Sequence, residues 1–162
     1  MDSSVVLGVD IGGTNTVYGF INRDGHIYDH KEIPTRGEKP VTDLVGRIES
    51  RTKNFLENNP ELVLYGIGIG APNGNHFTGM IADPPNLSWG NVDIIALFKE
   101  RFDCKASLTN DANAAALGEK YFGVAKDMSD FIVITLGTGL GSGIFSGGRL
   151  LYGHDGFAGE MG

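Results

Sequence analysis

The sequence is poor in cysteine, in long apolar runs and in positive charge, and each shortage excludes a class of protein. Cys104 is the single cysteine among 162 residues, so the chain can form neither an internal disulfide nor a zinc site of several thiolates. No apolar stretch approaches the ~18 residues that span a bilayer. The first Lys or Arg is Arg23, so the amino terminus lacks the basic region of a signal peptide. We therefore expect a cytoplasmic protein with no membrane partner.

Positive charge is scarce relative to negative charge, and two common nucleotide-binding patterns are missing. The formal net charge is −7 at pH 7, which provides no general attraction to nucleic acid or to anionic lipid. The Walker A pattern G-x-x-x-x-G-K-[ST] and the dinucleotide pattern G-x-G-x-x-G do not occur. We therefore expect a small ligand and no nucleic-acid partner, and a nucleotide would have to bind without either of these loops.

Glycine, by contrast, is abundant, with 25 residues, about twice the usual share of roughly 7%. Two glycines follow an apolar strand expected over 5–9, in the hexapeptide Asp10-Ile11-Gly12-Gly13-Thr14-Asn15. Glycine reaches positive φ without a Cβ penalty, so successive N–H groups can converge on a phosphate, with the Thr14 hydroxyl as a further donor. Asp10 could then hold a magnesium ion or its water. The alternative is an ordinary hairpin turn before a strand over 16–21.

Hydrophobic periodicity predicts alternating strands and helices along much of the chain. Strands over 16–21 and 26–33 are joined by the hairpin signal Asn22-Arg23-Asp24-Gly25, which implies an antiparallel three-stranded start. Helical spacing predicts helices over 43–57, 94–102 and 112–122, and buried strands are expected over 62–69, 105–109 and 130–136. The segment 75–91 shows no clear period, so we expect a long loop that is either functional or mobile.

The order of strand, glycine-threonine turn and strand returns late in the sequence. The strand over 130–136 is followed by Gly137-Thr138-Gly139-Leu140-Gly141-Ser142-Gly143, so that residues 134–145 form a weak repeat of residues 7–20. Hairpin signals lie at matching distances downstream of both turns. Two such turns indicate a nucleotide whose phosphates are held from both sides. The alternative for the second turn is a flexible bend at the end of a strand.

An acidic residue lies where a strand gives way to a helix, in Thr109-Asn110-Asp111-Ala112-Asn113. Asn110 or Asp111 could simply be the N-cap that satisfies free backbone N–H groups. In the catalytic interpretation, Asp111 accepts the proton of a substrate hydroxyl as that hydroxyl attacks the γ-phosphate of a nucleotide. A helix amino terminus would favour the ionised carboxylate by ~0.3 to 1 kcal/mol.

Two further segments have the composition of a sugar site. Asp83-Pro84-Pro85-Asn86-Leu87-Ser88-Trp89 combines a stiff backbone, an amide and the single tryptophan of the chain. Gly156-Phe157-Ala158-Gly159-Glu160 places a carboxylate after small residues, and a carboxylate can accept two hydroxyls in fixed geometry. Taken alone, the first segment is only a loop and Glu160 is only a surface glutamate.

Five motifs, in order along the chain, resemble those of the ROK family of sugar kinases and repressors, specifically its bacterial glucokinase branch. They are two phosphate motifs, a segment with a catalytic aspartate, a sugar loop and a segment with a sugar-binding glutamate. In this sequence the two phosphate motifs are Asp10 to Asn15 and Leu136 to Gly141, and the segment with the catalytic aspartate is Asn110 to Glu119. The sugar loop is Pro85 to Trp89, and the segment with the sugar-binding glutamate is Gly156 to Gly162. One departure is Ser142, which stands where the family more often has glycine.

The resemblance implies a role for each residue that matches a motif. It implies Asp111 as catalytic base and magnesium at Asp10 through a water molecule. It implies sugar contacts from Asn86, Asn110, Asp111 and Glu160, and we expect Gly70 and Ala71, at the end of the strand over 62–69, at the same site. The implied contacts to the phosphates of ATP are Gly12, Gly13, Thr14, Asn15, Gly137, Thr138 and Gly139.

The resemblance also implies a fold and an activity. The fold would be an α/β, actin-like ATPase or ribonuclease H-like fold, a mixed sheet with flanking helices, in residues 1–118. Residues 119–162 would begin a second domain. The activity would be transfer of phosphate from ATP to a hexose, glucose first among the candidates. N-acetylmannosamine, N-acetylglucosamine and fructose kinases share these motifs, and the alternative class is a sugar-responsive repressor. Such repressors usually carry an amino-terminal helix-turn-helix, for which a first strand starting near Val5 leaves no room.

The family pattern is longer than this chain. After Gly162 it continues with a histidine, a zinc-binding cluster rich in cysteine, another sugar-binding glutamate and the adenosine pocket. The resemblance therefore implies an amino-terminal portion that is poorly active alone and does not contain the zinc ligands. For the full-length protein it implies a homodimer or homotetramer.

Overall fold

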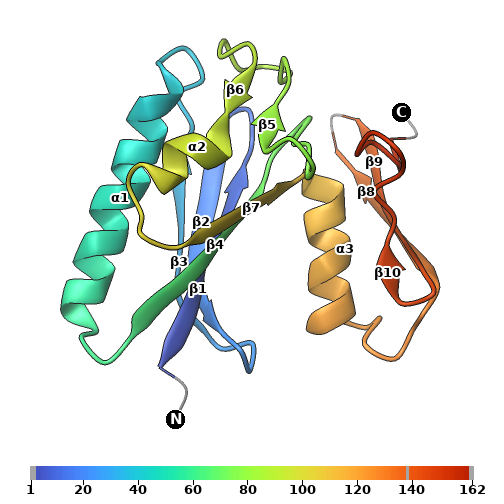
Figure 1. Ribbon diagram of the computed structural model, residues 1–162, viewed down its shortest axis with the longest axis horizontal. Helices are drawn as coiled ribbons and strands as arrows, with labels where there is room; N and C mark the ends of the chain where they lie inside the picture. Colours follow the sequence, from blue (N-terminus) through green and yellow to red (C-terminus); the bar gives the residue numbers. More distant parts are fainter. Residues whose placement is uncertain (1–2, 138, 161–162) are drawn as a thin grey trace.

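The computed structural model of the protein describes residues 3–137 and 139–160, and its centre is a mixed five-stranded sheet (Figure 1). The strand order is β3-β2-β1-β4-β7. The first three strands, β1 (Ser4–Ile11), β2 (Asn15–Asn22) and β3 (Ile27–Pro34), form the predicted antiparallel meander. β4 (Val63–Gly70) pairs parallel with β1, and β7 (Lys105–Thr109) pairs parallel with β4.

The core lies between one face of this sheet and two helices. Along β1, Val5, Leu7 and Val9 are buried and alternate with half-buried residues, which gives the strand one apolar face. Helix α1 (Val41–Asn58) buries a stripe of apolar residues against the sheet, and the rings of Phe20 and Phe55 stack with centroids 3.9 Å apart. The short helix α2 (Ile94–Lys99) adds two more buried side chains.

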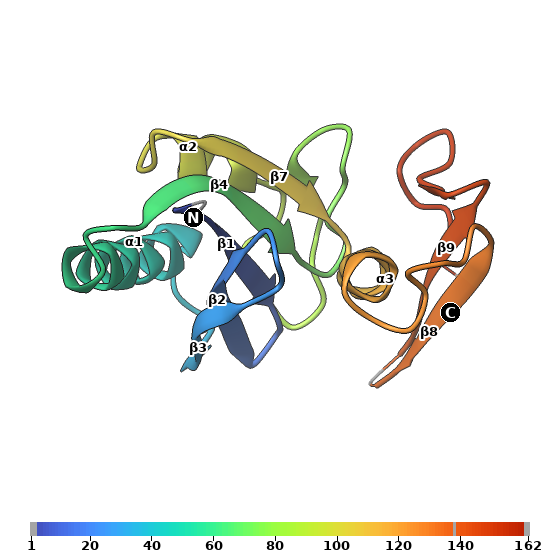
Figure 2. The same cartoon turned by 90° about the horizontal axis from the view of Figure 1, so that it is seen from below.

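Helix α3 (Asp111–Tyr121) lies between the central sheet and a second, smaller sheet (Figures 1 and 2). The second sheet is antiparallel, with order β10-β9-β8, and consists of β8 (Phe131–Leu136), β9 (Leu140–Ser146) and β10 (Arg149–Leu150). Small residues allow its close approach to α3. A Cβ on Gly143 would come within 2.5 Å of the Ala116 methyl group and 2.7 Å of the Ala112 carbonyl oxygen.

The repeat seen in the sequence is a structural repeat, since each half is a β-meander whose first turn contains glycine. β1, β2 and β3 pair antiparallel in sequence, and so do β8, β9 and β10. The hairpin interpretation of the first turn is therefore correct, and the second turn, for which the alternative was a flexible bend, also joins two antiparallel strands. This geometry also proves compatible with the phosphate interpretation, because both turns lie at one cleft.

Two details of the prediction were wrong. The expected helix over 94–102 ends at Lys99 and continues only as a hydrogen-bonded turn. The expected loop over 75–91 contains β5 (Met80–Ile81), which pairs with β6 (Val92–Asp93). Strands of two residues are too short to show a period, so pattern analysis could not find them. Among the described residues, no helix is both long enough and apolar enough to cross a membrane.

Candidate active site

Six segments that are distant in the sequence surround a cleft of about 540 Å³ between the two sheets. They are the β1–β2 turn, the loops that follow β4 and β5, the first residue of α3, the β8–β9 turn and the end of the described chain. The lining residues are Gly12, Gly13, Pro72, Asn73, Pro85, Asn86, Asp111, Thr135, Leu136, Gly137, Gly139, Leu140, Gly141 and Glu160. A groove of about 620 Å³ elsewhere, beside α1, is lined by none of the predicted site residues that the structure describes. The predicted site residues therefore identify the 540 Å³ cleft as the candidate active site.

We call the β1–β2 turn, residues 12–15, the phosphate turn. Carbonyl groups of this turn accept hydrogen bonds within the protein, whereas two of its N–H groups do not donate to any described residue. It is closed by a hydrogen bond from the Gly12 N–H to the Asn15 carbonyl, 3.0 Å long. A Cβ on Gly12 would lie 2.6 Å from that same oxygen, so this position requires glycine. Thr35 donates to the carbonyls of Gly12 and Thr14, at 2.7 and 2.8 Å. Within the described part of the chain nothing accepts from the N–H groups of Gly13 and Thr14, which leaves them available to an anion.

The other predicted phosphate contacts divide into three groups. Gly137 and Gly139 line the cleft from the β8–β9 turn, where the Gly137 N–H donates to the Gly139 carbonyl at 3.1 Å. Thr138 lies outside the described residues. Asn15 is not among the lining residues, and its side-chain amide instead donates to the carboxylate of Glu32 on β3.

Asp10 and Asp111 are neighbours beside the cleft; Asp111 lines it, whereas Asp10 is not among the lining residues. Asp10 is near the end of β1 and Asp111 begins α3, where its Oδ1 accepts from the Ala112 N–H at 2.8 Å. Gly70 lies between them, and a Cβ on it would be 3.6 Å from the Asp10 Oδ1 and 3.8 Å from the Asp111 Cα. Desolvation by the surrounding protein and, second, the charge of Asp111 raise the pKa of Asp10 above its ordinary value. Two neighbouring carboxylates of this kind favour a bound cation.

Asn110 both caps α3 and contacts Glu160. Its Oδ1 accepts from the Asn113 N–H at 2.7 Å, as an N-cap does. Its Nδ2 donates to the Glu160 Oε1 at 2.5 Å, although the two residues are 50 positions apart. The side chain is only 1% exposed. Asn110 is therefore the N-cap of α3, as one interpretation predicted; it is not among the residues that line the cleft, and its contact with a sugar stays a prediction.

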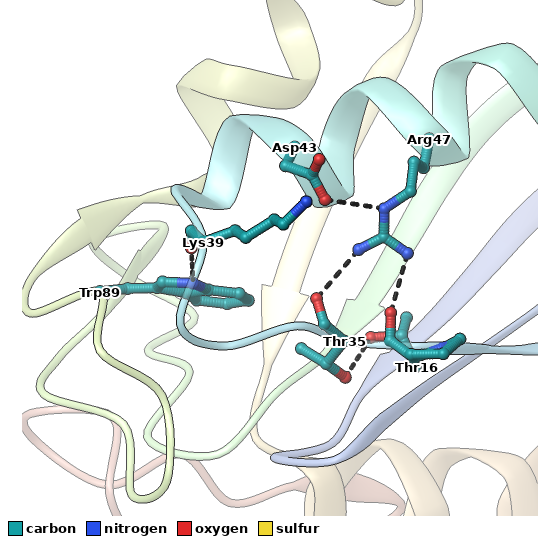
Figure 3. Close-up of polar contacts among 7 residues, drawn as sticks. Thr16, Thr35, Lys39, Asp43, Arg47 and Trp89 are labelled. Atoms are coloured by element: carbon teal, nitrogen blue, oxygen red, sulfur yellow. Dashed lines mark hydrogen bonds and ion pairs between the residues drawn. The ribbon is translucent and has the colours of Figure 1, made fainter.

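Asn86 approaches the phosphate turn directly. It lies in the loop of residues 86–89, which we call the sugar loop, and it has a positive φ of 63°. A Cβ on Gly13 would lie 3.1 Å from the Asn86 Cβ, so the absence of a side chain at Gly13 permits this approach. Trp89, by contrast, is not among the lining residues. It packs against the core, and its Nε1 donates to the Lys39 carbonyl at 2.9 Å (Figure 3).

Residues 6–162 match the family model described as the ROK family. The chain belongs to the ROK family. The glucokinase of Halalkalibacterium halodurans is 35% identical over 161 residues, which cover 96% of this chain and 48% of that protein. The xylose repressor of Caldicellulosiruptor bescii is 35% identical over 166 residues, covering 99% of this chain and 41% of the repressor.

A solved ROK structure shows the same architecture. The crystal structure of a ROK family glucokinase from Streptomyces griseus, in complex with glucose and AMPPNP, has a TM-score of 0.85 at 33% identity. The match covers 98% of this chain and 49% of that one, so the chain spans about half the length of these relatives. The predicted α/β, actin-like ATPase fold is confirmed.

Two side chains of this ROK chain position the Glu160 segment, and sequence reasoning missed their role. The Ser142 hydroxyl donates to the Gly159 carbonyl at 2.5 Å, and the Asn75 Nδ2 donates to the Asp155 carbonyl at 2.6 Å. Both side chains are buried. The one available signal was that Ser142 stands where the family more often has glycine, and the structure shows what its hydroxyl contacts.

Gly70 and Ala71 support the ROK cleft without lining it. Ala71 is fully buried, and its N–H donates to the Thr109 carbonyl at 3.1 Å. The next two residues, Pro72 and Asn73, line the cleft instead. Among the described residues, no group of three or more His, Cys, Asp or Glu side chains is arranged to hold a metal ion. A cation here would therefore be bound by the Asp10–Asp111 pair together with oxygens from a ligand.

Proposed function

We propose that this ROK chain is the catalytic amino-terminal portion of an ATP-dependent hexose kinase, with glucose as the hexose. The observation that carries the proposal is that Asp111, Asn86 and Glu160 line the same cleft as both glycine turns. Glucokinases among its relatives support the reaction, as does the Streptomyces griseus enzyme, whose structure contains glucose and AMPPNP. A kinase needs sugar and phosphate sites side by side, and this cleft has residues suited to both.

In the proposed reaction, Asp111 accepts the proton of the 6-hydroxyl as that oxygen forms a bond to the γ-phosphorus. The bond from the γ-phosphorus to the bridging oxygen breaks, and ADP leaves with that electron pair. Asn86, Asn110 and Glu160 hold and orient the sugar, Glu160 as an acceptor of hydroxyl protons. The N–H groups of the phosphate turn stabilise charge on the phosphates. Much of the rate enhancement then comes from positioning.

Magnesium fits the neighbouring carboxylates of Asp10 and Asp111, of which Asp111 lines the cleft. Mg²⁺ usually binds proteins through one or two carboxylates and completes its coordination with water and substrate phosphate oxygens. Asp10 and Asp111 match that description; the pKa of Asp10 is raised by desolvation and, second, by the charge of Asp111, and a bound cation would offset both effects. In our proposal, Asp10 holds the ion through water. The bound ion would neutralise charge on the phosphates.

The proposed organisation is a first domain over 1–118 and the start of a second over 119–162. The two meanders, one on each side of α3, support two units, and the proposed boundary falls within α3 (Asp111–Tyr121), which contacts both sheets. In the full-length protein we propose a cytoplasmic homodimer or homotetramer, as the family resemblance implies.

A sugar-responsive repressor is the second candidate function, because a xylose repressor is as similar to this chain as a glucokinase is. N-acetylmannosamine, N-acetylglucosamine and fructose remain alternative substrates for a kinase. The Asp111 carboxylate, exposed to the cleft, favours the kinase, since a repressor needs to bind sugar but needs no base.

The test is an ADP-release assay on the complete natural chain with a panel of hexoses. Asp111→Asn should leave sugar binding nearly intact and lower turnover by about 10²- to 10⁴-fold, because a general base is lost. Asp24→Asn, in the exposed β2–β3 hairpin, is the matched control and should retain full activity. Near-normal turnover by Asp111→Asn would refute the role of the base. Specific operator binding released by sugar, in a gel shift, would instead favour the repressor.

A further inference from the structure

Residues 35–39, between β3 and α1, contact both sides of the cleft without lining it; we call them the connecting segment. On the phosphate side, Thr35 donates two hydrogen bonds to the phosphate turn: its hydroxyl to the Gly12 carbonyl and its N–H to the Thr14 carbonyl. The Thr16 and Thr35 hydroxyl oxygens are 2.9 Å apart. Since the Thr35 proton is used on Gly12, Thr16 donates to Thr35 and completes a buried chain of hydrogen bonds.

On the sugar side, the same segment binds the sugar loop. The Ser88 N–H donates to the Gly37 carbonyl at 3.0 Å, and the Trp89 Nε1 donates to the Lys39 carbonyl at 2.9 Å. A Cβ on Gly37 would lie 2.6 Å from the Leu87 Cδ2, so the two segments are in close contact. The phosphate turn and the sugar loop, which are proposed to bind different ligands, therefore both contact the connecting segment.

Arg47 on α1 fixes this support to the core of the domain (Figure 3). Its Nη1 and Nη2 donate to the carbonyls of Pro34 and Thr35 at 2.8 and 2.9 Å. Its Nε donates to the Asp43 Oδ2 at 2.9 Å, which sets the plane of the guanidinium. Arg47 does not line the cleft. A planar fork with donors in fixed directions suits this contact, and a lysine could not reproduce it.

We propose that Arg47 is a positioning residue for both substrates of the proposed kinase, acting through the connecting segment. By holding the carbonyls of Pro34 and Thr35, it fixes the phosphate turn through Thr35 and the sugar loop through Gly37 and Lys39. The inference rests on the proposed function only for the identity of the two ligands. That one guanidinium orders both the phosphate turn and the sugar loop follows from the hydrogen bonds alone.

Four variants and a control separate the effects on the phosphate turn from those on the sugar loop in steady-state kinetics on the complete chain. Arg47→Lys should raise KM for ATP and for the hexose, each about three- to tenfold, with kcat changed less than either. Thr35→Val should raise mainly KM for ATP, and Trp89→Phe mainly KM for the hexose. Thr35→Ser keeps the hydroxyl and should restore the wild-type KM for ATP. Thr52→Val also removes a buried hydroxyl, within α1, and should change neither constant.

Hydrogen exchange provides a readout that needs no enzymatic activity. Amides of residues 12–15 and 86–89 should exchange faster in Arg47→Lys than in Thr52→Val, and those of 12–15 faster in Thr35→Val. If the natural chain phosphorylates no hexose, the proposed function fails while this measurement still tests the positioning role. The inference would be overturned if Arg47→Lys left amide exchange unchanged in both the phosphate turn and the sugar loop. It would also be overturned if Arg47→Lys changed the KM of only one substrate.

Discussion

Asp10 shows at the scale of one residue how a site can oppose stability. It is next to the last residue of an apolar strand, at a position that is exposed to solvent. The surrounding protein nevertheless desolvates its carboxyl group in part, and this desolvation, followed by the charge of Asp111, raises its pKa. A carboxylate with a raised pKa lowers the stability of the folded chain at neutral pH, and the cation proposed to bind here would offset that cost.

Asp10→Asn should therefore stabilise the ligand-free protein at neutral pH. Because the fold raises the pKa of Asp10, the folded chain binds this proton more tightly than the unfolded chain does. The resulting stabilisation is complete below the ordinary pKa of 3.8 and is lost as the pH rises through the raised value. The advantage of Asp10→Asn should thus shrink as the pH falls toward 3.8, in chemical denaturation over this range. Asp24→Asn is the control; an Asp10→Asn protein no more stable than wild type at neutral pH would contradict this account.

At the scale of the element, α3 is the helix on which the cleft depends. Its first residue is Asp111, its N-cap is Asn110, and its alanines pack on the glycines of β9. It thus carries the proposed base, a contact to Glu160 and the junction between the two sheets. A change at its cap has two consequences, one for the helix and one for the sugar site.

Replacing Asn110 by serine or by alanine should separate these two consequences. Serine retains an N-cap acceptor, so Asn110→Ser should be about 1 kcal/mol more stable than Asn110→Ala in urea denaturation. Neither variant has the amide that donates to Glu160, so both should raise KM for the hexose by a similar factor. Equal stability of the two variants would show that the cap contributes little. A wild-type KM in Asn110→Ser would show that the amide is not needed for the sugar site.

At the scale of the whole molecule, the second sheet leaves an apolar face exposed. Ile132, Ile134 and Leu136 alternate along β8 and are 54%, 58% and 83% exposed. β8 is also an edge strand, since the sheet order ends with it. An apolar face beside an unpaired edge is a typical site of association.

The 162-residue chain alone should therefore self-associate with rising concentration. Ile132→Thr combined with Ile134→Thr should shift it toward monomer in analytical ultracentrifugation, because threonine retains strand propensity and removes apolar surface. Ile27→Thr alters a residue on β3 that is 55% exposed, and it should leave the association unchanged. A wild-type chain that stays monomeric at high concentration would contradict this prediction.

Much of the fold was predictable because it depends on local pattern. The alternation of β1, the hairpin signal after β2 and the helical spacing of α1 depend on residues close in sequence, and all three elements occur as expected. Strands β5 and β6 were not predictable, because two-residue strands exist only through their pairing with each other. Likewise, no local pattern showed that Trp89 binds a backbone carbonyl 50 residues away, outside the cleft.

The sequence by itself determined which residue types were available for phosphate, sugar and proton transfer, because glycine turns and motif spacing are local properties. Tertiary structure alone decided which of them meet. It brought Asp10 beside Asp111 and Glu160 to Asn110, and it left Asn15 with Glu32. It also brought Arg47 to the carbonyls of Pro34 and Thr35, since such contacts depend on how sheet and helices pack.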